Sequence, residues 1–367
     1  AAVAALFNDE GRRDPHAALR ALAHLPTARH ETVDAMLRDP RFHRVAPQSA
    51  EPLWAMLARW LISLDGERHR RLRARFTGLF GPRVVERFRV EIQSRADELI
   101  DAVATDGQIE LVSGFARPLP FSVITRVLGL GDVDRAAVGA NLLTMNRAFA
   151  HQDDPEHLSR GHAAAEELAR RFERLLDERS ADPRDDLLST LAADLPDDAD
   201  ERADLVANCV FFVEAGHATT TSLIASGVVL LLEHGGMPAS LPRAVEEVLR
   251  LTTPVTSVMC APHDDVEVDG CRFAAGVPRH AFLAAANRDP EVFPDPGRFD
   301  PDRDPNPHLA FAAGRHFCLG APLARLHGEI ALATLLRRLP GLRLDGEPEW
   351  RGSLPLRELE RLPVAWD

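Results

Sequence analysis

Cys318 stands in a segment whose residue types could hold a metal through sulfur. Residues 311–320 read Phe-Ala-Ala-Gly-Arg-His-Phe-Cys-Leu-Gly, with Gly314 and Gly320 on either side of the cysteine. Glycine permits a tight turn, and backbone N–H groups aimed at a thiolate temper its charge. The periodicity of residues 321–339 predicts a helix whose positive N-terminal end would lie near the sulfur. A lone cysteine is more often a small buried hydrophobe, but that alternative leaves the two glycines, the histidine and the helix unexplained.

The composition restricts where such a site would work. The formal net charge of −13 argues against nucleic acid as a partner. Cys209, Cys260 and Cys271 give neither CxxC spacing nor a disulfide framework, which fits a reducing, cytoplasmic setting. No apolar run reaches the roughly 18 residues that span a bilayer. The basic residues are all Arg, 43 in number, which we interpret as codon usage. These features predict a cytoplasmic protein with no membrane partner.

The elements that must position the cysteine follow from periodicity. We expect one domain over residues 1–367 that is mainly α with a minor β portion. Dense Pro and Gly, with short apolar pieces at Val266–Val268 and His280–Ala285, predict strands in the β part. The expected portions are a helical bulk over about 14–251 and 321–339, a β-rich part over about 252–310, and the cysteine loop over 311–320.

The cysteine loop resembles the haem-binding signature of the cytochrome P-450 superfamily, Phe-x-x-Gly-x-His-x-Cys-x-Gly. The resemblance continues from about residue 14 to the end of the chain. Residues 247–250, Glu-Val-Leu-Arg, are similar to the Glu-x-x-Arg helix of that family, and residues 286–290 and 299–303 are similar to the segments that follow it. The resemblance implies the cytochrome P-450 fold and a bound haem b, with Cys318 as the axial ligand of the iron and Phe311 beside the haem.

Further residues acquire roles through the resemblance. His69 and Arg73, one helical turn apart, would bind the haem propionates together with His316. An i, i+3 pair such as Glu247 and Arg250 is by itself more often a solvated surface pair. In the family this pair is buried and joined by a downstream Arg, for which Arg303 is the candidate, and its role is to hold the cysteine loop in shape.

One position departs from the family pattern on the propionate side. Where the family usually places an arginine after the Glu-x-x-Arg helix, this chain has Cys260. One charged clamp is therefore expected to be missing.

The segment 211–220 resembles the oxygen-binding stretch of the family. Ala215 and Gly216 would open the helix for dioxygen, and Thr219 would hydrogen-bond dioxygen and help to deliver protons. The usual acidic residue is replaced by Ala218, so the usual proton relay is incomplete. Glu214 lies about one turn earlier on nearly the same face. It would replace the missing acid, anchor a cationic or hydrogen-bonding substrate group, or pair with an arginine elsewhere if the helix is rotated.

These residues predict a haem-thiolate monooxygenase that hydroxylates or epoxidises a small organic substrate with O2, in natural-product tailoring. Electrons would come from NAD(P)H through a ferredoxin reductase and a ferredoxin. A first alternative keeps the haem but uses peroxide, reduces nitric oxide or couples radicals. A second alternative, motivated by Cys260 and Ala218, is a haem-binding sensor or carrier without turnover.

Overall fold

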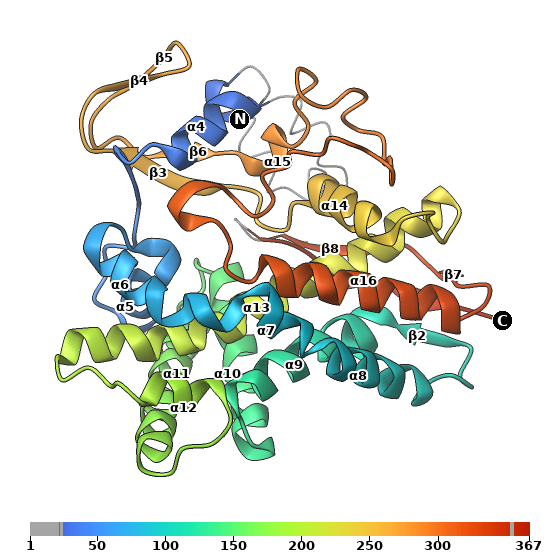
Figure 1. The fold of residues 1–367 in the computed structure, drawn as a ribbon, viewed down its shortest axis with the longest axis horizontal. Coiled ribbons are helices and arrows are strands. Elements are labelled where there is room, and N and C mark those ends of the chain that lie inside the picture. The colour runs from blue at the N-terminus through green and yellow to red at the C-terminus, as the bar shows by residue number, and fades with distance from the viewer. Residues whose placement is uncertain (1–21, 23–24, 353–355) are drawn as a thin grey trace. The chain divides into compact units, whose positions relative to one another are not determined.

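Figure 1 shows the fold of the computed structural model, which describes residues 22, 25–352 and 356–367. The chain forms two compact units, the first made of residues 1–43, 82–120 and 218–367 and the second of residues 44–81 and 121–217. Helices α9 (Pro118–Leu128) and α13 (Ala199–His234) contribute residues to both. The single domain expected over residues 1–367 stays a prediction, and its residues 1–21, 23, 24 and 353–355 lie outside the described residues.

The first unit combines helices with four small sheets. Its helices are α4 (His30–Arg38), α7 (Pro82–Glu86), α8 (Arg89–Asp101), α14 (Leu241–Thr252), α15 (Leu283–Ala286) and α16 (Ala321–Arg338), with short turns η1 (Pro26–Ala28), η4 (Val112–Ala116) and η5 (Gly314–His316). Its strands are β1 (Phe42–Arg44, whose last residue belongs to the second unit), β2 (Gln108–Glu110), β3 (Val258–Pro262), β4 (Val266–Val268), β5 (Cys271–Phe273), β6 (Arg279–Ala281), β7 (Arg343–Leu344), β8 (Glu349–Gly352), β9 (Arg357–Arg361) and β10 (Pro363–Ala365).

The sheets of the first unit are short and have local registers. The strand orders are β1-β3-β6, β2-β10-β7, β4-β5 and β8-β9. In the β4–β5 hairpin, Val268 pairs with Cys271, and the two turn residues Asp269 and Gly270 have φ values of 49° and 70°. Positive φ at both central residues is the requirement of a type I′ turn, which Asp-Gly meets readily. The predicted strand Val266–Val268 is present as β4.

The predicted strand His280–Ala285 is wrong over its second half. Strand β6 ends at Ala281, and residues 283–286 form the short helix α15, whose side chains are all buried. Three of these four residues are alanine, the residue with the highest helix propensity. Because the whole segment is buried, its continuous apolar character gave no periodicity to separate helix from strand.

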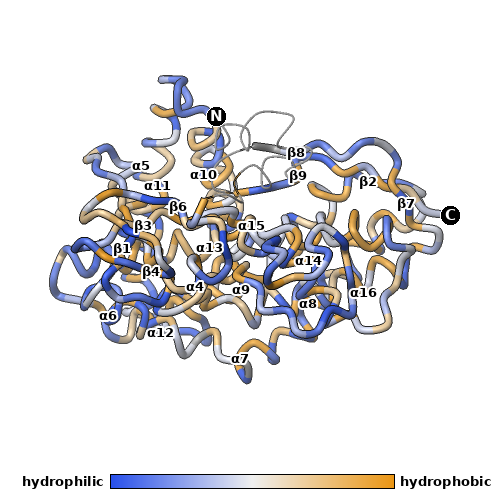
Figure 2. The backbone as a smooth tube through the Cα atoms, turned by 90° about the horizontal axis from the view of Figure 1, so that it is seen from above, coloured by the Kyte–Doolittle hydropathy of each residue, from blue (hydrophilic) through white to orange (hydrophobic). Residues whose placement is uncertain are grey.

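The second unit is helical. Its elements are α5 (Pro52–Ala58), η2 (Leu61–Ser63), α6 (Gly66–Thr77), η3 (Gly78–Phe80), α10 (Asp132–Ala150), α11 (Pro155–Ala181) and α12 (Leu187–Ala192), with most of α9 and the first half of α13. Helix α11 begins with a well-formed cap, in which the Asp154 carboxylate accepts hydrogen bonds from the backbone N–H groups of Glu156 and His157. Along many of the helices the tube in Figure 2 alternates between hydrophilic and hydrophobic residues, as amphipathic helices do.

The structure confirms the fold class, mainly α with a minor β portion. The predicted helix 321–339 is present as α16. The apolar segment 202–233 lies within α13, which is helical without a break across Ala215 and Gly216.

Close packing in the first unit depends on small residues between helices. A Cβ atom added to Gly328 of α16 would lie 3.2 Å from side-chain atoms of Leu223 in α13 and of Val245 in α14. A larger side chain at residue 328 would therefore force α16 away from α13 and α14. Helices α14 and α16 are labelled in Figure 1.

We expect Gly328→Leu to lower the free energy of unfolding by about 1–3 kcal/mol, the usual cost of overpacking a core. The matched control is Gly78→Leu, because a Cβ atom at Gly78 meets nothing within 4 Å. Denaturant titration of both variants and the wild type measures the difference. Equal losses for the two variants would contradict the packing argument.

Candidate active site

The cysteine loop is held in a tight backbone conformation. The Cys318 N–H donates to the Phe311 carbonyl at 3.0 Å, and the Phe317 N–H donates to the Gly314 carbonyl at 3.0 Å. Ala312 and Gly314 both have positive φ, of 56° and 66°. The loop therefore folds back on itself, with the first and eighth residues of the motif joined by a backbone hydrogen bond.

The loop also packs against the end of α4. A Cβ atom at Gly314 would lie 2.5 Å from the Leu37 carbonyl oxygen and 3.0 Å from the Arg38 Cα, so only glycine fits. The guanidinium of Arg315 donates to the Asp39 carbonyl at 3.4 Å and also to the Phe42 carbonyl. Arg315 occupies a variable position of the motif, so the sequence gave no signal for this contact.

The sulfur-bearing residue lies at the surface of its unit. Cys318 is exposed, and its neighbour Phe317 has 42% of its side chain exposed. Helix α16 begins at Ala321, directly after the loop, and a Cβ atom at Gly320 would lie 3.9 Å from the Cys318 Sγ. The positive end of the helix therefore follows within three residues of the Cys318 thiol.

These residues fit a haem group. A thiolate is a soft ligand suited to iron, and the apolar Phe317 beside it suits the face of a porphyrin. Among the described residues, no cluster of three or more His, Cys, Asp or Glu side chains is arranged to hold a metal ion. Cys318 would hold the iron of a haem group, which would supply redox chemistry there.

A half-buried ion pair between α16 and α14 packs against the cysteine loop. The guanidinium of Arg325 in α16 donates to both carboxylate oxygens of Glu246 in α14, at 2.7 and 2.8 Å, and His308 contacts the same carboxylate at 3.2 Å. The guanidinium also lies over the Phe311 ring, 4.7 Å from its centroid. Burial raises the pKa of Glu246, but the hydrogen bonds from Arg325 and His308 outweigh it and lower that pKa to about 2. Sequence reasoning missed Glu246 and Arg325, because their partners lie 62 and 79 residues away.

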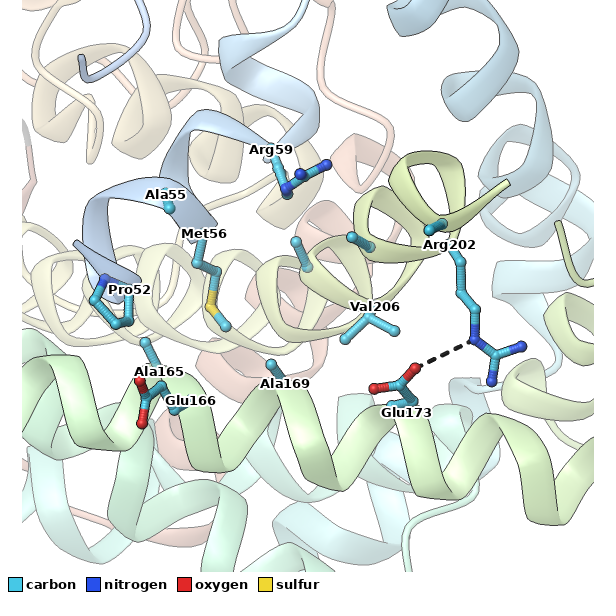
Figure 3. A pocket seen from close by; sticks show the side chains of 13 residues that line it. Pro52, Ala55, Met56, Arg59, Ala165, Glu166, Ala169, Glu173, Arg202 and Val206 are labelled. Carbon is cyan, nitrogen blue, oxygen red and sulfur yellow. Dashed lines mark hydrogen bonds and ion pairs between the residues drawn. The ribbon is translucent and has the colours of Figure 1, made fainter. Parts of the chain in front are cut away.

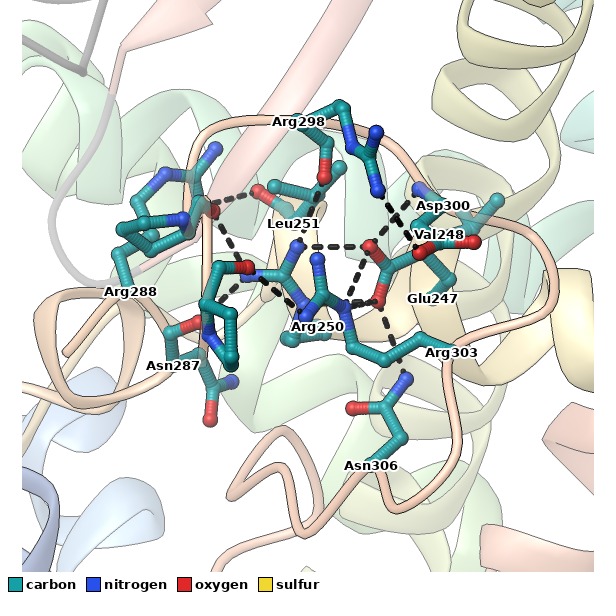
Figure 4. A network of polar contacts seen from close by, with 12 residues as sticks. Glu247, Val248, Arg250, Leu251, Asn287, Arg288, Arg298, Asp300, Arg303 and Asn306 are labelled. Atoms are coloured by element: carbon teal, nitrogen blue, oxygen red, sulfur yellow. Dashed lines mark hydrogen bonds and ion pairs between the residues drawn. The ribbon is translucent and has the colours of Figure 1, made fainter. Parts of the chain in front are cut away.

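A second, fully buried pair lies at the neighbouring residues of α14 (Figure 4). Arg250 donates to both oxygens of Glu247 at 2.7 Å and to the carbonyls of Asn287, Pro296 and Arg298. These contacts use all five N–H groups of the guanidinium. Arg303 also contacts Glu247, at 3.1 Å, as the sequence predicted. The role of the triad in holding the cysteine loop remains a prediction.

Asn287 connects this buried pair to the loop. Its carbonyl accepts from Arg250 at 2.8 Å, while its side-chain oxygen accepts from the Leu309 N–H at 2.6 Å. Its side-chain amide donates to the Thr253 hydroxyl at 2.9 Å. Leu309 precedes the motif by two residues, so the path from the ion pair to the loop is continuous. The sequence gave Asn287 only as part of a family-like segment.

The predicted oxygen-binding residues share one face of α13. Between Asp204 and Val228, every residue is buried except Ala215, Gly216 and Thr219. Their spacing, i, i+1 and i+4, places them on one side of the helix. A Cβ atom at Gly216 would lie 3.1 Å from Ile124 of α9, so packing also requires a small residue there. Ala218, at the position of the usual acid, is buried.

The remaining predicted site residues belong to the second unit. His69 is buried and Arg73 is half-buried, both on α6, and Glu214 is buried on α13 with 8% exposure. Their place beside the cysteine loop stays a prediction. His316, in the first unit, is half-buried in the turn η5.

Cys260, which stands at the position of the usual arginine, is a core residue. It lies on β3, is buried, and packs in a hydrophobic cluster with Phe42 and Phe273. Cys260 therefore contributes apolar packing at the position where the family usually places the charged clamp.

The second unit contains a cavity of about 340 Å3 between α5, α11 and α13 (Figure 3). Six of its thirteen lining residues are alanine, Met56 and Val206 add apolar surface, and the ion pair between Arg202 and Glu173, at 3.3 Å, lies at its edge. None of the predicted site residues of this unit lines the cavity.

Comparison with known proteins shows which family the chain is similar to. A sequence profile described as Cytochrome P-450 matches residues 236–342. The chain is 38% identical to the cytochrome P-450 monooxygenase PikC of Streptomyces venezuelae over 92% of this chain and 84% of that protein. It is 37% identical to the mycinamicin IV hydroxylase/epoxidase of Micromonospora griseorubida over 92% of this chain and 88% of that protein. The crystal structure of P450BioI with an acyl carrier protein ligated to hexadec-9Z-enoic acid superposes with a TM-score of 0.91 at 30% identity, covering 98% of this chain and all of that one.

The chain belongs to the cytochrome P-450 family. It is accordingly an oxidoreductase of the monooxygenase type, with haem iron as its cofactor and redox partners as its source of electrons.

One helix bears on the membrane question. Within the described residues, only α13 is long and apolar enough to cross a bilayer, and 67% of its most apolar window is buried inside the protein. A core helix of a globular protein shows the same burial.

We expect Glu246→Gln to destabilise the protein in a pH-dependent way. The folded pKa of Glu246 is about 2 and its ordinary value is 4.5. The stabilisation is therefore fully present above pH 4.5 and is lost as the pH falls toward 2. The variant should lose up to about 3 kcal/mol of unfolding free energy at pH 7 and about 2 kcal/mol at pH 3.5.

Urea titrations at the two pH values measure this difference. Glu291→Gln, which changes an exposed carboxylate, is the matched control. A loss that is the same at both pH values would show that the ion pair does not depend on the charge of Glu246.

Proposed function

We propose that this chain hydroxylates or epoxidises a small organic substrate with O2 in the tailoring of a natural product. The observation that carries the proposal is the exposed thiol of Cys318 on a rigid loop at the start of α16. When bound there, a haem b supplies the redox chemistry that inserts an oxygen atom. The names of the relatives, a cytochrome P-450 monooxygenase and a hydroxylase/epoxidase among them, support the reaction class.

In this proposal the chain ligates the haem iron, holds the haem propionates and controls the delivery of protons. The Cys318 thiolate ligates the iron, with Phe311 packed beside it. His69, Arg73 and His316 hold the propionates. The support offered by the structure is that Phe311 is buried under Arg325 and that His69 is buried on α6.

The oxygen side of the proposal rests on α13. Ala215 and Gly216 are small enough to admit dioxygen beside the helix on the face that Ile124 does not cover, and the Thr219 hydroxyl orients dioxygen and passes a proton to it. Because Ala218 carries no proton, the Glu214 carboxylate either holds the proton that Thr219 passes on or anchors the substrate. The partial exposure of Ala215, Gly216 and Thr219 within a buried helix supports the first part of this assignment.

We further propose that the electrons arrive from NAD(P)H through a ferredoxin reductase and a ferredoxin, in the cytoplasm. The arginines of α6 do not strengthen this assignment. Arg70 pairs with Glu67, Arg71 with Glu67 and Glu201, and Arg75 with Asp194. This helix is therefore not a strongly positive docking face, and the assignment of the donor depends on family membership.

Two alternatives follow from specific positions. Ala218, buried where the family has an acid, favours direct use of peroxide, reduction of nitric oxide or radical coupling. Cys260, packed in the core where an arginine was expected, favours a haem-binding sensor or carrier. Consumption of NAD(P)H with a ferredoxin system, compared with turnover on peroxide alone, distinguishes these functions from the proposed one.

The first test is the absorption spectrum of the dithionite-reduced protein under carbon monoxide. We expect a strongly red-shifted Soret band that Cys318→Ala abolishes, because only the thiolate gives this shift. Cys271→Ala, at another cysteine that is not fully buried, is the control and should keep the band. A band typical of a His-ligated haem in the wild type would refute the assignment.

The second test concerns Glu214. We expect Glu214→Gln to reduce coupled product formation or substrate affinity at least tenfold, because the amide can neither hold the proton nor carry the charge. Glu233→Gln, an exposed change on the same helix, should leave both unchanged. Wild-type coupling and affinity in the Glu214 variant would remove this residue from the mechanism.

A further inference from the structure

We infer that Asp204 and Asn208 of α13 are positioning residues that fix helix α6 and thereby the haem-propionate residues His69 and Arg73. The inference rests on the proposed function for the roles of His69 and Arg73. The contacts themselves lie entirely within the second unit and involve neither of those two side chains.

Asp204 is a buried carboxylate shared by two arginines. The Nε of Arg68 donates to one of its oxygens at 2.5 Å, and an Nη of Arg68 donates to the other. Arg59, just before the loop that leads into α6, donates to Asp204 at 2.9 Å and to Asp200 at 2.8 Å. A bidentate guanidinium contact fixes orientation as well as distance. Arg68 directly precedes His69 in α6, so the pair fixes the helix at the residue beside the predicted ligand of the propionate.

Asn208 is fully buried one turn further along α13. Its side-chain oxygen accepts from the Leu61 N–H at 2.7 Å, and its amide donates to the carbonyls of Arg59 and Asp204, both at 2.8 Å. The contacts with Leu61 and Arg59 attach the connection between α5 and α6 to α13. A buried amide with its donors and its acceptor engaged specifies one arrangement of the backbone around it.

The other end of α6 is fixed by aromatic packing. Phe76 of α6 and Phe80 of η3 stack on Phe212 of α13, with ring centroids 4.3 and 5.3 Å apart from it. On α13, Asp204 and Phe212 are eight residues apart, and their partners on α6, Arg68 and Phe76, are also eight residues apart. Two helices that meet through equally spaced residues have a fixed register.

The register decides where His69 and Arg73 point. Rotating α6 by one residue would turn its side chains by about 100° and shift them by about 1.5 Å along the axis. The ion pair at Arg68 and the stack at Phe76 oppose such a rotation from both ends of the segment that carries the two residues. Asp204 and Asn208 therefore act through α6, without touching haem or substrate.

The test compares two substitutions of the same kind on the same helix. Arg68→Gln removes one of the two arginine partners of Asp204, whereas Arg71→Gln removes an arginine that pairs, among the described residues, with Glu67 and Glu201. The side chains of Arg68 and Arg71 are 47% and 61% exposed, so both variants should fold. The readouts are the rate of haem transfer to an apo-globin acceptor and hydrogen–deuterium exchange of the amides of residues 61–77. Asn208→Leu is a third variant that tests the Leu61 contact directly.

We expect Arg68→Gln to release haem at least fivefold faster than the wild type, with the red-shifted carbon monoxide band unchanged, and to exchange faster along α6. Asn208→Leu should show the same effects, with the largest change at the Leu61 amide, while Arg71→Gln should stay within twofold of the wild type. Equal rates for Arg68→Gln and Arg71→Gln, or unchanged exchange along α6, would overturn the inference. If the wild type takes up no haem, the proposed function fails, and the exchange data alone still decide whether Asp204 and Asn208 position α6.

Discussion

The buried ion pair between Glu247 and Arg250 sets the strictest electrostatic constraint on the irregular segment that precedes the cysteine loop. Both side chains are completely inaccessible, and a charge in such a place is tolerated only when it is paired and every remaining donor and acceptor is engaged. Arg250 meets that requirement through the carbonyls of Asn287, Pro296 and Arg298, and Glu247 meets it through Arg303, Asn306 and the Asp300 N–H. The irregular segment between α15 and the cysteine loop therefore takes a course that supplies hydrogen-bond partners to these two buried charges.

The support of the loop is distributed over three separate contacts. Asn287 links the buried pair to Leu309, Arg325 covers Phe311 while pairing with Glu246, and Arg315 holds the carbonyls after α4. Each contact reaches a different residue of a short segment that has almost no regular secondary structure. A loop that lacks the regular backbone hydrogen bonds of a helix or sheet is kept rigid by contacts with neighbouring residues. These contacts explain how the Cys318 thiol can have a defined direction on a loop without regular secondary structure.

The sequence was most informative where chemistry and periodicity are local. The motif around Cys318, the helix that follows it and the contact of Arg303 with Glu247 could all be predicted, because a specific pattern or a family-like segment carries each of them. The short helix α15 could not, since a uniformly buried run has no periodicity to interpret. Three other contacts could not be predicted either: the pair of Glu246 with Arg325, the contacts of Arg315, and the ion pair of Asp204 with Arg68. In each of them, charged residues of ordinary type meet partners more than 70 residues away in the chain. No spacing rule relates such partners before the fold brings them together.

The exclusive use of arginine for positive charge has a consequence for the chemical reactivity of the protein. Every network described above, at Arg68, Arg250, Arg315 and Arg325, is built on guanidinium groups, and no lysine side chain exists anywhere in the chain. Reagents that modify side-chain amines, and enzymes that acetylate or methylate lysine, therefore find nothing to act on in these networks. Dicarbonyl reagents, which attack guanidinium, face a graded target that runs from the inaccessible Arg250 to the exposed Arg70. The covalent reactivity of the positively charged side chains is thus that of a single functional group, whose accessibility follows the ion pairing of the fold.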